Sequence, residues 1–387
     1  MKRKLPFCAL LAVVLLMPEQ AQAIPAFARK YNMSCSTCHQ PFPRLKAYAD
    51  EFAGNGFQLE GNEPPRAFRE TGDDQLLLMR DLPLAVRVEG FARWLPQHGA
   101  GEGTSDWELP YVLKVLSGGQ IARDVSYYFY FLLGERGEIA GLEDAFVMFN
   151  NVGGSGLDLT VGQFQVSDPL FKGELRLTLE PYTVYGSAPG SSLANLKYDR
   201  GVMVNYGFSS GTDLVLEVVN GAGIGAMNGG VFDRDRYKNF VFRVSQEIGE
   251  HIRIGGIGYL GNEEQNGRKN SLWMAGPDLT VALGPVEVNL QYVARKDENP
   301  YFLSASTEVT TKGGFAEMIY LPDGDKSRWY GALLYNGVDS DDTALKYETA
   351  SAHFGLLLAR NLRAVAEYTY DFQVKANQLS VGLVSAF

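Results

Sequence analysis

Apolar and polar residues alternate with a period of two along most of the chain from about Leu82 onward. In the segment 286–292, valine, leucine and tyrosine occupy one face, whereas glutamate, asparagine and glutamine occupy the other. The segment 362–372 repeats this pattern. No apolar run in this region approaches the roughly 20 residues that a membrane-spanning helix needs. The pattern predicts β-strands that each have one apolar and one polar face.

The alternation predicts sixteen such strands. An even number of them fits an antiparallel barrel whose apolar face points to lipid, whereas a soluble sandwich would turn that face inward. The predicted fold class is therefore all-β, an outer-membrane antiparallel β-barrel of about 16 strands with a small N-terminal α-helical module. The strands are expected near 82–94, 107–117, 123–133, 139–150, 156–165, 199–208, 212–220, 237–248, 251–260, 270–283, 285–295, 311–320, 328–337, 345–358, 361–372 and 376–387.

The connections between these strands differ in length. Those after even-numbered strands are short, such as 249–250, whereas several after odd-numbered strands are long and polar, such as 166–198 and 262–269. Because outer-membrane barrels have short periplasmic turns and long external loops, both termini are expected in the periplasm. The last strand ends at Phe387, and a terminal phenylalanine on an alternating strand resembles the recognition signal of bacterial outer-membrane barrels. A soluble β-protein that ends in phenylalanine by chance is the alternative.

The N-terminal residues have the pattern of a secretory signal. Three basic residues at 2–4 precede an apolar run over 5–17, and Ala21-Gln22-Ala23 provides small residues at a cleavage site. About 13 apolar residues are too few to cross a bilayer core of roughly 30 Å as a helix. We therefore predict a signal peptide over 1–23, and hence export.

Composition and charge narrow the function classes. Of the 387 residues, 45% are hydrophobic and 21% are charged, as in a folded protein. Signal cleavage would leave 32 basic and 44 acidic residues, which changes the net charge from −10 to −12. Such an acidic chain is not expected to bind nucleic acid. Cleavage would also leave only two of the three cysteines, too few for a disulfide-stapled scaffold.

These two cysteines belong to one motif, Cys35-Ser36-Thr37-Cys38-His39. Cys-x-x-Cys-His is the attachment pattern of c-type haem. Two thiols one turn apart can each bond one vinyl group of the porphyrin, and the adjacent imidazole then lies under the iron. We therefore predict one c-type haem, with Cys35 and Cys38 as covalent attachment sites and His39 as the proximal ligand. The alternatives fit less well, since a disulfide needs no histidine, a thioredoxin motif needs a βαβ setting and zinc needs more ligands.

The surrounding residues predict a monohaem cytochrome module over 24–81, followed by the barrel over 82–387. One amphipathic helix of about three turns is expected between Pro43 and the Gly54-Asn55-Gly56 turn. The aromatic residues that could cover the porphyrin, or form an ordinary core, are Phe27, Tyr31, Phe42 and Phe57.

Met79 is the candidate distal ligand, because it is the first methionine after the predicted helix and stands immediately before the strands begin. Its alternative role is to fill an apolar gap. Met33 lies too close to Cys35 to reach the other face of the iron, and His98 could reach it only if its loop folded back. The choice matters because methionine gives a higher reduction potential than histidine.

A signal peptide, one Cys-x-x-Cys-His module and a C-terminal barrel together resemble the fused monohaem cytochrome–porin family of bacterial outer membranes. The motif match covers 24–61, and it carries over Cys35, Cys38 and His39. The barrel also resembles phosphate-selective porins in its architecture. The resemblance implies oxidation of extracellular Fe(II), electron transfer to a periplasmic cytochrome, and outer-membrane lipid around the barrel. It thus implies an Fe(II):cytochrome c oxidoreductase.

Two other functions stay open, a diffusion porin with a haem-bearing plug and a haem peroxidase-like enzyme. No further catalytic residue can be assigned from the sequence, and His353 is expected at the surface or in the lumen. Acidic residues expected in the outer loops could concentrate Fe²⁺, or they could simply be solvated. These clusters are Glu263-Glu264, Asp297-Glu298, and Asp339 with Asp341-Asp342.

Overall fold

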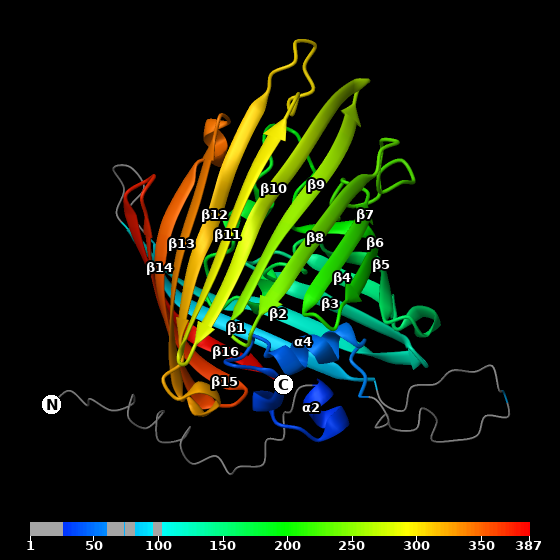
Figure 1. Cartoon of the computed structure of the whole chain (residues 1–387). Coiled ribbons are helices and arrows are strands. Elements are labelled where there is room, and N and C mark those ends of the chain that lie inside the picture. Colours follow the sequence, from blue (N-terminus) through cyan, green and yellow to red (C-terminus); the bar gives the residue numbers. More distant parts are fainter. Residues whose placement is uncertain (1–25, 60–72, 74–81, 96–102) are drawn as a thin grey trace.

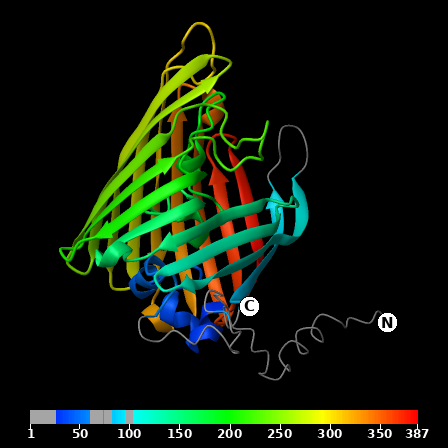
Figure 2. The same cartoon turned by 90° about the vertical axis from the view of Figure 1, so that its right-hand side faces the viewer.

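The computed structural model describes residues 26–59, 73, 82–95 and 103–387. In these ranges the chain forms a closed barrel of sixteen antiparallel strands, with a short helical segment at one end (Figure 1, Figure 2). The predicted sixteen-strand barrel is confirmed. The signal peptide, Met79 and His98 lie outside the described residues.

Each strand pairs with its neighbours in sequence, and the last strand pairs with the first to close the barrel. The strands are β1 Leu84–Leu95, β2 Thr104–Ala122, β3 Val125–Glu135, β4 Gly141–Phe149, β5 Leu157–Gln165, β6 Tyr198–Gly207, β7 Thr212–Val219, β8 Asn239–Ile248, β9 Ile252–Gln265, β10 Arg268–Leu283, β11 Val286–Asp297, β12 Val309–Tyr320, β13 Trp329–Ser340, β14 Tyr347–Ala359, β15 Leu362–Asp371 and β16 Ala376–Ala386. The helices are α2 Ala26–Tyr31, α3 Cys35–Cys38 and α4 Ala47–Gly54. No helix in the described part of the chain is both long and apolar enough to cross a membrane.

The period-two alternation decides which side chains face outward. In β11, Leu290 and Tyr292 are exposed on the outside of the barrel, whereas Asn289 and Gln291, which alternate with them, are buried. β7 follows the same rule, because its leucines are exposed while Glu217 is 1% exposed. An apolar exterior around a closed ring of strands is what a barrel in contact with lipid requires.

The two ends of the barrel differ. Phe387 closes the ring through backbone hydrogen bonds with Val86, one in each direction, at 2.6 and 2.8 Å. β1 therefore begins where β16 ends. The same end carries the turns 123–124, 249–251 and 284–285. We call it the short-turn end, and we call the opposite end the loop end.

Some loops at the loop end are shorter than the sequence predicts. β9 and β10 continue to a two-residue turn, Asn266-Gly267, in which both residues have positive φ angles, 51° and 71°. The expected loop 262–269 is therefore wrong. β11 similarly extends to Asp297. As a result Glu263 and Asp297, which were expected in acidic loops, lie in strands with buried side chains.

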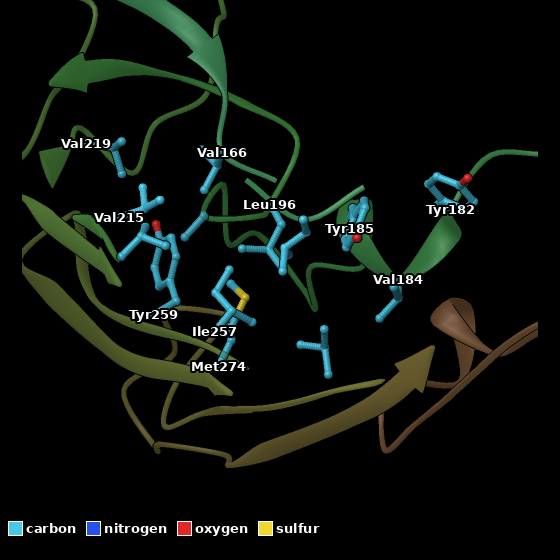
Figure 3. Close-up of a cluster of buried hydrophobic side chains, with 14 of the residues drawn as sticks. Val166, Tyr182, Val184, Tyr185, Leu196, Val215, Val219, Ile257, Tyr259 and Met274 are labelled. Carbon is cyan, nitrogen blue, oxygen red and sulfur yellow. The ribbon is translucent and has the colours of Figure 1, made fainter. Parts of the chain in front are cut away.

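The connection 166–197 between β5 and β6, which we call the inner loop, folds into the barrel and is not an outer loop as expected. Its apolar side chains pack against the inner faces of β6–β13 in one buried cluster (Figure 3). Leu177 packs against β12 and β13, while Leu179 packs against a cluster on β1, β2, β15 and β16. The inner loop thus contacts the wall on opposite sides of the lumen. Its residues in the large cluster are Val166, Leu170, Tyr182, Val184, Tyr185, Ala194 and Leu196.

Buried polar side chains fasten the inner loop to the wall. Arg295 pairs with Asp297 at 2.6 Å and donates to the Ala194 carbonyl oxygen, also at 2.6 Å. Glu263 accepts the N–H of Ala194 at 3.1 Å. On the opposite wall, Glu367 accepts the N–H of Leu179 at 2.7 Å. Backbone groups in the buried parts of the inner loop are thus paired with side chains of the wall.

Arg295→Met is expected to lower the free energy of unfolding by about 3–5 kcal/mol, because it removes the cation that pairs with the fully buried Asp297. Denaturant titration in detergent measures this change. Lys296→Met is the matched control: its partly exposed pair with Glu308 is worth at most about 1 kcal/mol. Equal effects of the two variants would contradict the anchoring role.

Candidate functional site

The helical segment α2–α4 lies at the short-turn end of the barrel (Figure 1). The predicted helix is α4, which begins at Ala47 and spans eight residues, about two turns. It is shorter than expected because Leu45 forms a β-bridge with His39 instead of joining the helix. Phe27 stacks on Phe57 with ring centroids 5.0 Å apart and meets Phe52 at 5.5 Å. These three aromatic rings form the core of this segment.

The motif begins with one helical turn, α3. Ser34 caps this turn, because its Oγ accepts the N–H of Ser36 at 3.3 Å. Cys35 and Cys38 stand at the two ends of the turn as free, half-buried thiols. Burial raises the pKa of both thiols, so they are protonated at neutral pH. The turn therefore presents two reduced sulfur atoms side by side, as two thioether bonds require.

The ring of His39 is held through one nitrogen. Nδ1 lies 3.0 Å from the Pro43 carbonyl oxygen and 3.1 Å from that of Arg44. Because a carbonyl oxygen only accepts, Nδ1 carries the proton and Nε2 keeps its lone pair. Burial lowers the pKa of His39, although the hydrogen bonds to Arg44 and Pro43 act in the opposite direction. A neutral imidazole with Nδ1 fixed and Nε2 available is the form that binds iron.

The barrel wall holds the segment that contacts His39. Arg44 forms an ion pair with Glu287 of β11, and Arg363 of β15 donates to the Phe42 carbonyl oxygen at 2.7 Å. The Phe42 ring meets the His39 ring edge-on, with centroids 4.9 Å apart. The position of the histidine therefore depends on the barrel as well as on the helical segment. Other contacts join Lys46 to Asp325 (2.5 Å), Asn150 to Gly54 (2.8 Å) and the rings of Phe57 and Tyr128 (5.0 Å).

A cavity of about 1340 Å³ lies between the motif and the inner loop. Cys35, Cys38 and His39 line it on one side, while Phe171 and Tyr182 of the inner loop line it on the other. All three motif residues thus open onto one space, which is lined by apolar and polar groups together. Two thiols, a neutral imidazole and an adjoining cavity are a donor set that fits a covalently attached haem.

The distal ligand predicted from the sequence, Met79, lies outside the described residues. Among described residues, Met33, Met148 and Met203 line the cavity, as does His251. Nothing in the sequence singles out Met148 or Met203, because their relation to the motif depends on which strands the helical segment contacts. Their inward orientation could have been read from the strand alternation alone.

The acidic residues near the loop end have structural partners. Glu263 and Asp297 fasten the inner loop, and Asp339 pairs with Lys346 at 2.9 Å. Asp342 accepts the N–H of Gly190 at 3.0 Å. Over the described residues, no three His, Cys, Asp or Glu side chains are arranged to hold a metal ion. These clusters therefore give no support to an iron-binding site in the loops.

Neither a protein-family model nor a curated protein matches the chain. Solved structures of porins do match it. An anion-selective porin from Comamonas acidovorans has a TM-score of 0.58 at 11% identity, over 79% of this chain and 99% of that one. The outer membrane channel DcaP of Acinetobacter baumannii has a TM-score of 0.58 at 14% identity, over 79% and 97%. Salmonella typhi OmpF follows with 0.55 at 12% identity over the same shares. The chain therefore contains a barrel of the porin type.

Proposed function

We propose that this protein is an electron conduit of the bacterial outer membrane. Electrons pass from an extracellular donor through one c-type haem to a periplasmic cytochrome. The donor in this proposal is Fe(II). The observation that carries the proposal is the common cavity at the short-turn end, onto which Cys35, Cys38 and His39 open. Short turns face the periplasm in barrels of this class, so a haem held there lies within reach of a periplasmic partner.

The outer-membrane location rests on the barrel itself. Leucine and tyrosine side chains of β7 and β11 are exposed on its outside, and its fold is that of porins. In this proposal the short-turn end, where β1 begins and β16 ends, faces the periplasm. The apolar exterior would then contact outer-membrane lipid.

Each residue of the motif has one task in this proposal. A c-type haem, when bound, supplies a one-electron redox centre. Cys35 and Cys38 would hold it covalently, and Nε2 of His39 would be its iron ligand, because Nδ1 is already held by two carbonyl oxygens. The inner loop lies between this cavity and the loop end, and its apolar side chains fill part of the lumen there.

A diffusion porin with a haem-bearing plug is the second candidate, which the porin fold favours. A diffusion pore needs a water-filled lumen. Here the inner loop buries an apolar cluster against the wall, with Val166 and Tyr259 completely buried (Figure 3). The apolar cluster that the inner loop places inside the barrel therefore supports the conduit more strongly than the pore.

The proposal is tested with the purified full-length protein. We expect the absorption spectrum of a six-coordinate c-type haem, which anaerobic mixing with Fe(II) in a stopped-flow instrument reduces. A six-coordinate haem that Fe(II) does not reduce at the working pH would exclude iron as the donor. A five-coordinate haem that reacts rapidly with peroxide would favour the peroxidase-like enzyme, and a protein without haem would overturn the proposal.

A further inference from the structure

One buried guanidinium beside the proposed haem ligand has no carboxylate partner. Arg363 of β15 is 5% exposed, and its Nη1 donates to the Phe42 carbonyl oxygen at 2.7 Å and to the Tyr330 hydroxyl at 2.5 Å. Its Nε has no hydrogen-bond partner, and no described carboxylate forms an ion pair with it. The other deeply buried arginines differ, because Arg243 pairs with Asp278 and Arg295 with Asp297.

An unpaired buried cation is expensive to keep in a folded protein. The groups that face Arg363 do not neutralise it. Phe42 comes from the helical segment and Tyr330 from β13, and both are uncharged. Behind Tyr330 lies His353, at 3.4 Å, whose Nδ1 is 2.9 Å from Glu367. That carboxylate is already used by His353 and by two N–H groups of the inner loop.

A second cation lies on the same aromatic ring. The guanidinium carbons of Arg363 and Arg87 are each 5.7 Å from the centroid of the Phe42 ring. Arg87 is paired with Glu89, so the excess positive charge at this point comes from Arg363. The same ring contacts His39, with centroids 4.9 Å apart. The Phe42 ring therefore contacts both the Arg363 guanidinium and the ring of the proposed iron ligand.

We propose that Arg363 raises the reduction potential of the haem bound through Cys35, Cys38 and His39, an inference that rests on the proposed function. With haem bound, Fe(II) would give up one electron and become Fe(III), and the haem iron would go from Fe(III) to Fe(II) without transfer of a proton. Reduction removes one positive charge from the site, so a fixed nearby cation favours the reduced state. A guanidinium keeps its charge at every accessible pH. Arg363 is thus a positioning residue: through the reduction potential of the haem, its charge determines which electron donors can reduce the haem iron.

The test compares Arg363→Gln with Arg363→Lys in the full-length, haem-loaded protein, by spectroelectrochemical titration. Glutamine keeps a hydrogen-bond donor but removes the charge. We expect its equilibrium constant for reduction to fall about tenfold, which is 59 mV for a one-electron couple. Lysine keeps the charge, and its potential should stay close to that of the wild type. Arg328→Gln removes an exposed charge at the same end and serves as the control.

The outcomes separate charge from structure. If Arg363 only supports the fold, glutamine and lysine will change the potential equally, which would overturn the inference. Should the glutamine variant not assemble, Arg363→His replaces it: its potential should be higher at about pH 5 than at about pH 8, because only the protonated imidazole is charged. A pH-independent potential in that variant would also overturn the inference. A wild-type protein without haem would instead overturn the proposed function.

Discussion

Serine at both positions 35 and 38 is expected to remove all covalently bound haem and to leave the barrel folded. A hydroxyl group does not form the thioether bond to a porphyrin vinyl group that a thiol forms. The barrel does not depend on these side chains, because its ring of strands closes between β1 and β16, remote in sequence from the motif. Peroxidase staining for haem after denaturing electrophoresis measures attachment, and circular dichroism in detergent measures the barrel.

The two single variants and one control make this test specific. Cys35→Ser and Cys38→Ser should each retain haem on the remaining thiol in reduced amount. Thr37→Ala, inside the same turn, should retain it fully, because position 37 offers no sulfur atom. Haem that stays bound after denaturation in the double variant would contradict the assignment of both cysteines. Fe(II) oxidation by the double variant would contradict the electron path through them.

The strand pattern was predictable because it is local. β16 was expected over 376–387 and is found at Ala376–Ala386, since each side chain on it faces either lipid or lumen. The predicted strand ends were wrong where a strand continues past the region in which one face is apolar and the other polar. Near Asn266-Gly267, residues on both faces of β9 and β10 are polar, so the alternation disappears although the backbone pairing continues. An alternation of apolar and polar residues reveals a strand only where its two faces differ in polarity. It does not reveal where the backbone hydrogen bonds between strands continue.

The candidate site was only partly predictable. The motif itself is contiguous, so Cys35, Cys38 and His39 could be named from spacing alone, and the structure brings them to one cavity. Arg363 and Glu287, which hold the segment around His39, are more than 240 residues away in sequence. Their role depends on which strands meet the helical segment, which no local pattern encodes.

The inner loop illustrates the same limit. Its length suggested an outer loop, and its apolar residues are spaced without the regular period of a helix or strand. Only the closed barrel gives those residues an interior to fill. A porin-type wall has inward polar side chains, and here several of them serve the inner loop instead of water, as Arg295, Glu263 and Glu367 do. The fold is that of a pore, and the inner loop occupies part of its lumen.

Replacing 168–195 with Asn-Gly is therefore expected to convert the barrel into an open channel. Ser167 and Leu196 are already joined by a backbone hydrogen bond of 3.1 Å, so a two-residue turn can connect them as a hairpin. The replacement removes most of the apolar cluster from the lumen. The charged wall residues then face water, as they do in porins. In planar lipid bilayers, the wild type should show little conductance and the variant large, porin-like steps.

A deletion within the connection 220–238 provides the control for this experiment. That connection lies at the loop end between β7 and β8, and its side chains at 227, 231 and 232 are exposed. Shortening it also deletes part of a connection between two strands, but it removes no side chains from the lumen. Conductance should therefore stay at the wild-type level. Porin-like conductance in the wild type would contradict the idea that the inner loop blocks the barrel, and it would favour the diffusion pore. A closed channel after removal of 168–195 would mean that an element other than the inner loop seals the barrel, such as the helical segment that lines the cavity at the short-turn end.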